Sequence, residues 1–491
     1  MRQARRSVTS GPASGTKLRA ILASAILLYC AAGRPVAAQN PAKLDDKVDA
    51  LVRAEMQRQR IPGLSLGVYR DGKIAKAQGY GLADIEWDAP VNPDTLFQSG
   101  SVGKQFTARA IMMLVEEGKV GLDDSIQKYF PGSPESWKNI RVRNLLTHTS
   151  GLAEYESEER GKADGPFYLR LDFTEEQLYK KITELPIDFK PGEKWSYRNT
   201  NYVLLGFLIH RVTGKFYGDF LKERIFTPLG MKSTRIISDA DIIPHRASGY
   251  EIVDGQLKNQ EWVSPTFNST ADGAMYFNIP DLEKWDAALY TESLLKKASF
   301  AQMWTPVTLQ SGKQVPYGFA WWIHEANGHR LLEHGGAWQG FTTAICRYVN
   351  DRLTVVVLTN LDAEHSDPGR IAHEVARLYV PELKLRAIAD TEPQVTALLR
   401  TTLAELSEGH LNLDSFAADQ RQAWSPERIK GLEEKIKSLG ELLAIGPTRT
   451  RTEEAGAWSY QYVVEFAKGS EVVNLLLDKT GKINGLDIHS E

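Results

Sequence analysis

Cysteine is scarce in this sequence, which has two among its 491 residues, Cys30 and Cys346. Because Cys30 lies in an N-terminal segment that we expect to be removed, the remaining chain can form no intramolecular disulfide. Such a chain must be held together by core packing, which its length allows. Cys346 stands in the apolar run FTTAICRYV, which predicts a buried structural thiol.

Excess positive charge and long apolar runs are also missing. The net charge is −3, which gives no indication of a nucleic-acid partner. The N-terminal apolar run covers only residues 20–33, too short to span a bilayer. Basic residues precede it, and Val36 and Ala38 fit the −3 and −1 positions of a cleavage site. We therefore predict a signal peptide over residues 1–38, cleaved near Ala38.

Removal of that segment changes the charge balance. It takes away six basic residues and no acidic ones, which leaves 53 basic and 62 acidic residues and a net charge of −9. We expect a periplasmic or secreted protein without a stable membrane anchor and without a nucleic-acid partner. An uncleaved anchor is the alternative.

Strand patterns flank a helical stretch in residues 39–385. A helix is predicted over residues 44–60, followed by two strands joined at Asp71-Gly72. Helical segments dominate residues 101–234, and consecutive antiparallel strands return over residues 317–359 before a last helix. This order predicts an α+β domain, with a mainly antiparallel sheet flanked by helices and a mostly helical lobe.

The hydrophobic pattern changes in residues 386–491, where amphipathic helices are followed by alternating strand patterns. We predict a separate small α+β domain, loosely similar to the NTF2-like domains. It could cover the cleft of the larger domain, form a dimer or only stabilise the fold, and the oligomeric state is left open.

The stretch FQSGSVGKQFTA places Ser101 three residues before Lys104. A serine hydroxyl is a poor nucleophile at neutral pH, and a lysine with a lowered pKa can take its proton. Residues i and i+3 share a helix face, and a helix N-terminus adds a positive dipole. However, Ser-x-x-Lys occurs four times in the chain, and a capping serine is the alternative, so the context must decide.

Further motifs supply that context. PGEKWSYRNTNY holds Tyr197 and Asn199, and HGGAWQGF begins with His334-Gly335-Gly336. GYGLAD, LLTHTSGL and FTPLGMKST are also present, and all these motifs follow the order of the serine β-lactamase and penicillin-binding-protein superfamily. The chain resembles this superfamily over residues 45–380. The likeness is to the class C β-lactamase, D-alanyl-D-alanine carboxypeptidase and esterase branch, which implies a β-lactamase/transpeptidase-like fold.

The resemblance also implies roles for these residues. Ser101 would be the acylating nucleophile, and Lys104 and Tyr197 would share the proton transfer. A Tyr197 phenolate would need a nearby cation at neutral pH, which Lys104 could supply. Asn199 would hydrogen-bond Lys104 or the substrate amide.

The same likeness places the oxyanion hole at the backbone N–H groups of Ser101 and Ala337, on an edge strand. Gly335 and Gly336 would let the substrate approach that strand closely. His148 in LLTHTSGL is interpreted as a structural residue at a helix-to-loop turn. Neither a metal nor another cofactor is expected, and HEVAR at His373 lacks the second histidine of a zinc-protease motif.

His334 stands where the family's Lys-Thr-Gly motif has lysine. Because histidine is mostly neutral at pH 7, this weakens the case for a penicillinase and suits esterases and peptidases. We predict a serine hydrolase that acts on a small-molecule or peptide ester or amide, of D-amino-acid, ester or β-lactam type, through a Ser101 acyl-enzyme. A true class C-like β-lactamase and a non-turnover penicillin-recognising protein are the alternatives.

Overall fold

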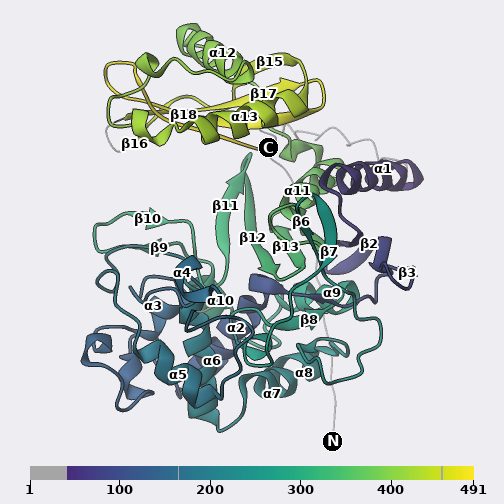
Figure 1. The fold of residues 1–491 in the computed structure, drawn as a ribbon, viewed down its shortest axis with the longest axis vertical. Coiled ribbons are helices and arrows are strands. Elements are labelled where there is room, and N and C mark those ends of the chain that lie inside the picture. The colour runs from purple at the N-terminus through teal and green to yellow at the C-terminus, as the bar shows by residue number, and fades with distance from the viewer. Residues whose placement is uncertain (1–40, 164, 455–456, 491) are drawn as a thin grey trace, which may run out of the picture. The chain divides into compact units, whose positions relative to one another are not determined.

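The computed structural model describes residues 41–490 except 164, 455 and 456 (Figure 1). The predicted signal peptide lies outside the described residues. In the described part of the chain, no helix combines the length and the apolar character needed to cross a membrane.

A seven-stranded antiparallel sheet joins the early and late parts of the chain. Its strand order is β11-β12-β13-β14-β1-β2-β3. The strands are β1 (Gly63–Arg70), β2 (Lys73–Asp84), β3 (Ala89–Pro90), β11 (Trp322–Ala326), β12 (His329–Trp338), β13 (Phe341–Tyr348) and β14 (Leu353–Thr359). Because β14 pairs with β1, the predicted split sheet around a helical insert is confirmed.

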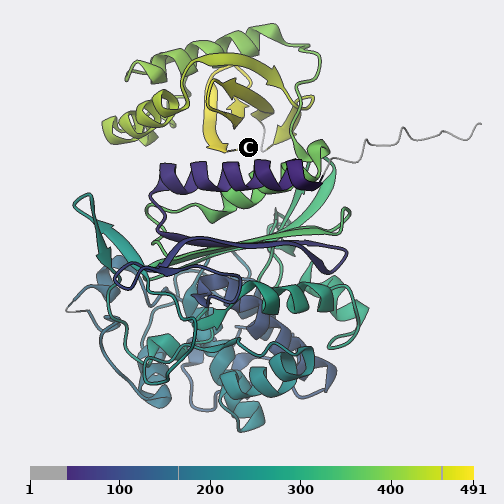
Figure 2. The ribbon, with the colours of Figure 1, turned by 90° about the vertical axis from the view of Figure 1, so that its right-hand side faces the viewer.

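Helices cover both faces of this sheet (Figure 2). On one face, α1 (Pro41–Gln59) and α11 (Pro368–Tyr379) contribute to an apolar cluster that includes the buried Cys346. On the other face, α2 (Lys104–Glu116) and α9 (Ile279–Ala288) contribute to the larger core. Strands β13 and β14 are buried on both faces, which explains their nearly continuous apolar sequences.

The helical lobe lies between β4 (Phe97–Gln98) and β8 (Met275–Phe277), which pair with each other. Its helices are α3 (Val142–Leu146), α4 (Glu158–Gly161), α5 (Glu175–Thr183), α6 (Asn199–Thr213), α7 (Tyr217–Leu221) and α8 (Thr227–Leu229). Outside the main sheet lie α10 (Lys297–Met303) and the short strands β5 (Arg235–Ile236), β6 (Tyr250–Val253), β7 (Gln256–Asn259), β9 (Val307–Thr308) and β10 (Gln314–Val315).

Residues 395–486 form a hydrophobic cluster of their own. Its elements are α12 (Pro393–Ser407), α13 (Pro426–Leu439), β15 (Leu442–Pro447), β16 (Thr452–Glu454), β17 (Ala457–Phe466), β18 (Gly469–Leu477) and β19 (Ile483–Ser490). Ser425 caps α13 as its sequence predicts, because its side chain accepts a hydrogen bond from the Arg428 N–H. The domain boundary near residue 386 and the NTF2 likeness stay predictions.

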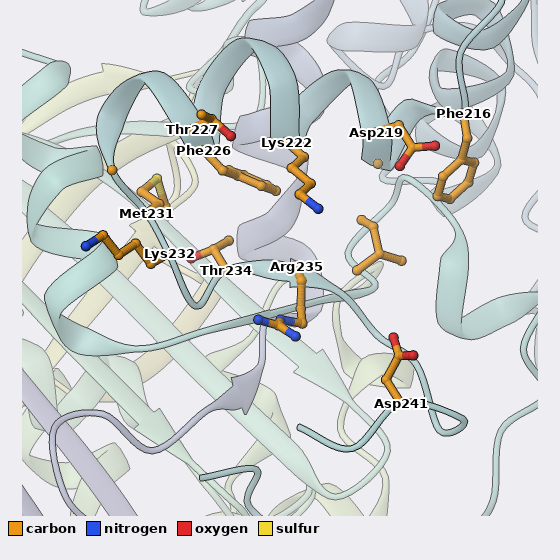
Figure 3. A pocket seen from close by; sticks show the side chains of 13 residues that line it. Phe216, Asp219, Lys222, Phe226, Thr227, Met231, Lys232, Thr234, Arg235 and Asp241 are labelled. Atoms are coloured by element: carbon orange, nitrogen blue, oxygen red, sulfur yellow. The ribbon is translucent and has the colours of Figure 1, made fainter. Parts of the chain in front are cut away.

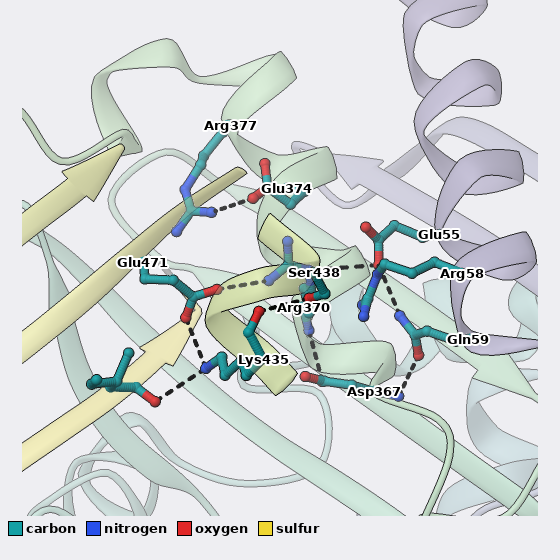
Figure 4. A network of polar contacts seen from close by, with 11 residues as sticks. Glu55, Arg58, Gln59, Asp367, Arg370, Glu374, Arg377, Lys435, Ser438 and Glu471 are labelled. Carbon is teal, nitrogen blue, oxygen red and sulfur yellow. Dashed lines mark hydrogen bonds and ion pairs between the residues drawn. The ribbon is translucent and has the colours of Figure 1, made fainter. Parts of the chain in front are cut away.

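A polar network connects this C-terminal part to α11 (Figure 4). The Glu471 carboxylate on β18 is fully buried and lies 2.8 Å from Lys435 Nζ and 3.5 Å from Arg370 Nη1. Arg370 also lies 3.5 Å from Glu55 of α1. Since a buried carboxylate is costly without partners, Glu471 depends on both cations.

A buried ion pair fixes α9 to the sheet. The Asp286 carboxylate accepts hydrogen bonds from Arg347 Nε and Thr354 Oγ1, each at 2.7 Å. Arg347 is fully buried, and its guanidinium carbon lies 4.7 Å from the centre of the Tyr290 ring. The ring faces add a cation–π contribution that the carboxylate alone does not supply.

We expect Asp286→Ala to lower the free energy of unfolding by about 3–5 kcal/mol, because it leaves the Arg347 charge buried without its counter-ion. Urea denaturation measures this change. The matched control is Asp123→Ala, which removes the exposed partner of Arg143 and should cost less than about 1 kcal/mol. Equal losses in the two variants would contradict the assignment.

Candidate active site

Ser101 and Lys104 lie on one helical segment. A short 3₁₀ turn, Gly100–Gly103, carries Ser101 and leads directly into α2, whose first residue is Lys104. Lys104 Nζ lies 3.0 Å from Ser101 Oγ. The predicted contact between the side chains of Ser101 and Lys104 is therefore present. The serine, however, lies on a 3₁₀ turn and not on the first turn of α2.

Two carbonyl oxygens hold the Lys104 amine in place. Nζ donates to Asn199 Oδ1 at 2.7 Å and to the Asp272 carbonyl at 2.5 Å. The Lys104 side chain has no exposed surface, so these contacts replace the water that a buried amine loses. Asn199 thus takes the lysine contact that the sequence predicts for it.

Carboxyl groups orient the Asn199 amide. Its Nδ2 donates to Glu156 Oε2 and its backbone N–H donates to Glu154 Oε2, each at 2.6 Å. Because Nδ2 faces Glu156, Oδ1 must face Lys104. Burial, with the charges of Asp272 and Glu154, raises the pKa of Glu156 to about 8, so this carboxyl group is mostly protonated at neutral pH.

Tyr197 lies over the same amine but without a hydrogen bond. Lys104 Nζ is 5.1 Å from the centre of the Tyr197 ring. The buried Tyr197 hydroxyl has no partner among the described residues. Burial raises the pKa of Tyr197, although Lys104 and Ser101 oppose the shift. The Tyr197 hydroxyl is therefore protonated at neutral pH, because its contacts with Lys104 and Ser101 do not offset the loss of water.

The predicted oxyanion donors lie where β12 becomes the edge strand of the sheet. The β11–β12 pairing stops at Trp322 opposite Glu333, whereas β12 continues to Trp338 against β13. The Ser101 turn packs against this free part. A Cβ at Gly100 would lie 2.4 Å from the Ala337 nitrogen, and a Cβ at Gly336 would lie 2.1 Å from the Ser99 carbonyl oxygen. The contact requires glycine at both positions.

His334 belongs to a chain of hydrogen bonds that fixes its charge. His148 Nδ1 accepts from the Arg198 N–H at 3.2 Å, so its Nε2 carries the proton that points at Tyr317 Oη, 3.3 Å away. Tyr317 Oη in turn lies 3.0 Å from His334 Nε2, and His334 Nδ1 lies 2.6 Å from the Gly335 carbonyl oxygen.

One placement of the protons satisfies all of these hydrogen bonds. Because a carbonyl only accepts, His334 carries its proton on Nδ1 and accepts from Tyr317 through Nε2. Both histidines are then neutral. Burial lowers the pKa of His334 to about 4 and holds that of His148 well below its ordinary value. His334 is therefore neutral, as expected. His148 lies at the predicted helix-to-loop turn, where its backbone φ is 56°.

A cavity of about 610 Å³ contains most of the predicted site. Its lining includes Ser101, Tyr197, His334, Gly335, Gly336 and Ala337. Another cavity, of about 510 Å³, is lined by residues of 216–241, including Lys222, Arg235 and Asp219 (Figure 3). None of the predicted site residues lines that cavity, so we place the site at the first.

The other Ser-x-x-Lys pairs in the described chain have different surroundings. Ser125 Oγ donates to the Lys138 carbonyl, and Lys128 pairs with Asp124. Ser293 Oγ lies 2.9 Å from Thr291 Oγ1 on the surface. Neither serine touches its lysine in the contacts found, which leaves Ser101 as the candidate.

Sequence reasoning missed Glu154, Glu156, Asp272 and Tyr317. Tyr317 and Asp272 come from segments without a recognised motif. The two glutamates follow LLTHTSGL, which was interpreted only as a turn. The one available signal was the sequence AEYESEE at residues 153–159, an acidic cluster directly after that motif.

Gly336→Ala tests the close approach of the Ser101 turn. Its Cβ would meet Ser99 and also Thr343 Oγ1 at 2.4 Å, so one strand or the turn must move. We expect a loss of about 1–3 kcal/mol in unfolding free energy. At Gly335 the nearest atom is 3.8 Å away, so Gly335→Ala is the matched control, measured by the same urea titration. A Gly336→Ala protein as stable as that control would show that the packing is loose.

Curated relatives match about two thirds of the chain or less. A penicillin-binding protein 4* of Bacillus subtilis is 31% identical over 311 residues, which cover 60% of this chain and 67% of that protein. A D-aminopeptidase of Brucella anthropi is 29% identical over 325 residues, which cover 65% of this chain and 60% of that protein. The chain thus spans about two thirds or less of the length of these relatives.

Solved structures share the fold. The D-amino acid amidase of Ochrobactrum anthropi SV3 aligns with a TM-score of 0.58 and 25% identity over 70% of this chain and 98% of its own. A penicillin-binding protein homologue from Pyrococcus abyssi aligns with a TM-score of 0.60 and 23% identity, and covers 91% of this chain and 98% of its own. The latter likeness concerns the fold alone.

The family model described as Beta-lactamase matches residues 48–379, more than half of the chain. This span contains the Ser101 turn, α6 and the sheet edge at β12. The predicted α+β class and the superfamily resemblance are both confirmed. The chain belongs to the β-lactamase family of serine hydrolases.

Proposed function

We propose that the protein cleaves an amide or ester of a D-amino acid or a D-amino-acid peptide through an acyl-enzyme on Ser101. The observation that carries the proposal is the 3.0 Å contact between Ser101 Oγ and a buried Lys104 amine that two carbonyl groups already hold. Such a contact is what an activated serine nucleophile requires.

The contacts of Lys104 allow its amine to act as the base for Ser101. A neutral amine has two hydrogens and one lone pair. If the hydrogens point to Asn199 Oδ1 and the Asp272 carbonyl, the lone pair faces Ser101 Oγ. Attack then moves the serine proton to Nζ, and the new ammonium stabilises the negative charge that develops on the substrate.

Tyr197 is suited to donate its own hydroxyl proton to the leaving group and then to recover a proton from the Lys104 ammonium. Its hydroxyl is protonated at rest, Tyr197 lines the same cavity as Ser101, and Lys104 and Ser101 lie near enough to oppose the rise in its pKa. The backbone N–H groups of Ser101 and Ala337 supply the two donors of the oxyanion hole. In this assignment Glu156 is a positioning residue, because it acts through the Asn199 amide.

The charge next to the oxyanion donor favours a substrate with an amino group. A pocket of about 660 Å³ runs along Ala337–Gly340 and is lined by one lysine and five carboxyl residues, Glu156, Glu158, Glu251, Glu261 and Asp362. Glu261 is paired with Arg170. Glu156 is mostly protonated, so the carboxylates left to attract a cation are Glu158, Glu251 and Asp362. Such a cation is the ammonium of an amino-acid amide or of a peptide N-terminus.

Two further considerations support this substrate class. A neutral His334 offers no fixed cation for a substrate carboxylate, which makes an efficient penicillinase the weaker candidate. Relatives include a D-aminopeptidase and a D-amino acid amidase. We also propose export after cleavage near Ala38, from the pattern of basic residues, apolar run and small residues at the N-terminus.

The test is hydrolysis of D-alanine p-nitroanilide by the mature protein, compared with the L-isomer and with the N-acetylated D-compound. We expect the free-amine D-compound to react fastest and Ser101→Ala to reduce the rate by roughly 10³-fold or more. Ser293→Ala, in a Ser-x-x-Lys sequence on the surface, is the control and should behave like the wild type.

Intact mass after incubation with a penicillin separates the alternatives. A persistent adduct on wild type but not on Ser101→Ala indicates a slowly deacylating penicillin-binding enzyme. Consumption of the drug without an adduct indicates a β-lactamase. Hydrolysis that survives Ser101→Ala contradicts the nucleophile, and a preference for the N-acetylated compound contradicts the amine subsite.

Glu156→Gln tests the protonated carboxyl beside Asn199. The pKa of Glu156 is raised from 4.5 to about 8, so the folded protein holds a proton that the unfolded chain releases. The stability from this group is fully present below about pH 4.5 and is lost as the pH rises to about 8. We expect the wild type to lose more unfolding free energy than Glu156→Gln between about pH 5 and pH 8.

Urea titrations at a series of pH values measure that difference. Glu158→Gln is the matched control, because Glu158 is the next carboxylate along the chain and is exposed. Its pH dependence should follow that of the wild type. Parallel curves for wild type and Glu156→Gln would mean that Glu156 is ionised throughout this range.

A further inference from the structure

Three potential metal ligands converge on the sheet face away from the helical lobe. Cys346 Sγ lies 3.4 Å from Glu333 Oε2, and His373 Nε2 lies 3.1 Å from the same oxygen. The sulfur, the imidazole nitrogen and the carboxylate oxygen all lie within 4.8 Å of one another. Neither the family's chemistry nor the proposed mechanism uses this cluster.

The fold brings the three residues together from separate segments. Glu333 on β12 is directly opposite Cys346 on β13, so their side chains share one face of the sheet. Helix α11 packs on that face and contributes His373. The cluster is mostly shielded from water, with Cys346 2% exposed.

We propose that Glu333, Cys346 and His373 bind a divalent transition metal of the zinc class. With metal–ligand distances of about 2.0–2.3 Å, ligand atoms around a tetrahedral zinc lie roughly 3.2–3.8 Å apart. The separations of Glu333 Oε2 from His373 Nε2 and from Cys346 Sγ, 3.1 and 3.4 Å, are close to that range. A thiolate and an imidazole favour zinc-class ions over magnesium or calcium, which prefer oxygen ligands.

The surroundings of His373 fit this role. Tyr348 Oη lies 2.7 Å from His373 Nδ1. If Nδ1–H donates to Tyr348, the lone pair of Nε2 faces the cluster, which is the arrangement usual for a metal-binding histidine. His324 Nε2 lies 3.6 Å from Glu333 Oε1, so His324 or water can supply the fourth ligand.

An entry path also exists. Glu333 and Cys346 line the 610 Å³ cavity that reaches Ser101 and His334. A metal can therefore reach the cluster without unfolding of the sheet, as a binding site requires. Once bound, it would tie α11 to β12 one residue before His334.

The sequence indicated no metal site because the ligands show no motif spacing. Cys346 and His373 lie 27 positions apart and Glu333 another 13 positions earlier. His373 was considered only as part of HEVAR, which lacks a second histidine. The competing explanation is a hydrogen-bonded brace in which the thiol and the imidazole both donate to Glu333.

Cobalt binding distinguishes the two explanations. Metal-free mature protein is titrated with Co²⁺, and absorption is recorded in the near ultraviolet and the visible. We expect one equivalent to bind with a thiolate-to-cobalt charge-transfer band and with intense visible bands of tetrahedral cobalt. Zn²⁺ should displace the cobalt and raise the thermal midpoint of unfolding.

The variants assign the ligands. Cys346→Ser should remove the charge-transfer band, and His373→Gln should weaken Zn²⁺ affinity by at least about 10-fold. His329→Gln is the matched control, because it breaks another histidine–carboxylate pair of the sheet, with Asp351 at 2.7 Å, and should leave the titration unchanged.

Three results would overturn the proposal. These are a wild-type titration without a charge-transfer band, a band that persists in Cys346→Ser, and equal Zn²⁺ affinity in His373→Gln and the wild type. If Cys346→Ser does not fold, X-ray absorption of the wild-type zinc protein replaces it. One sulfur in the zinc coordination shell supports the site, and none contradicts it.

Discussion

The contacts of the Lys104 amine are the constraint on which the rest of the site depends. A buried amine is costly unless its hydrogens find acceptors, and here the acceptors come from α6 and from the loop before β8. Ser101 faces the same nitrogen from the turn before α2. The three segments must therefore be in register before the amine can lose its water. The packing of the helical lobe and the geometry of the site are therefore coupled.

Burial has a consistent effect on the groups around this amine. It shifts the pKa values of Tyr197 and Glu156 upwards and those of His148 and His334 downwards, so each neighbour favours its neutral form. During the proposed reaction, negative charge develops on the substrate oxygen. In the site that we propose, the fixed dipoles of the backbone N–H groups at the sheet edge face that charge where water screens it little.

The contact between Ser101 and Lys104 was predictable from a local pattern, because the two residues are one helical turn apart. Asn199, which opens a helix, and Gly336 were expected from the family motifs. Gly336 was expected to admit the substrate, whereas in the structure it lies where two backbones touch. Tyr317 and Asp272 could not be predicted this way, because their roles come from long-range packing against His148 and Lys104. The split sheet was predictable from alternating strands, whereas the 3₁₀ turn at Ser101 depends on its contact with β12. The protonation of Tyr197 was not predictable, because it depends on how much water the fold excludes.

Strand β12 contributes side chains to both faces of the sheet, the one toward the candidate active site and the one covered by α11. Since side chains alternate along a strand, His334 points to the core shared with the helical lobe and Glu333 to the face covered by α11. Glu333 is held by His373 and Cys346, and His334 is held by Tyr317. Ala337, whose backbone N–H is the proposed oxyanion donor, lies three residues after His334 on the same strand. A ligand that tightens the Glu333 cluster would therefore restrict the backbone that carries the proposed oxyanion donor, without any contact with the substrate.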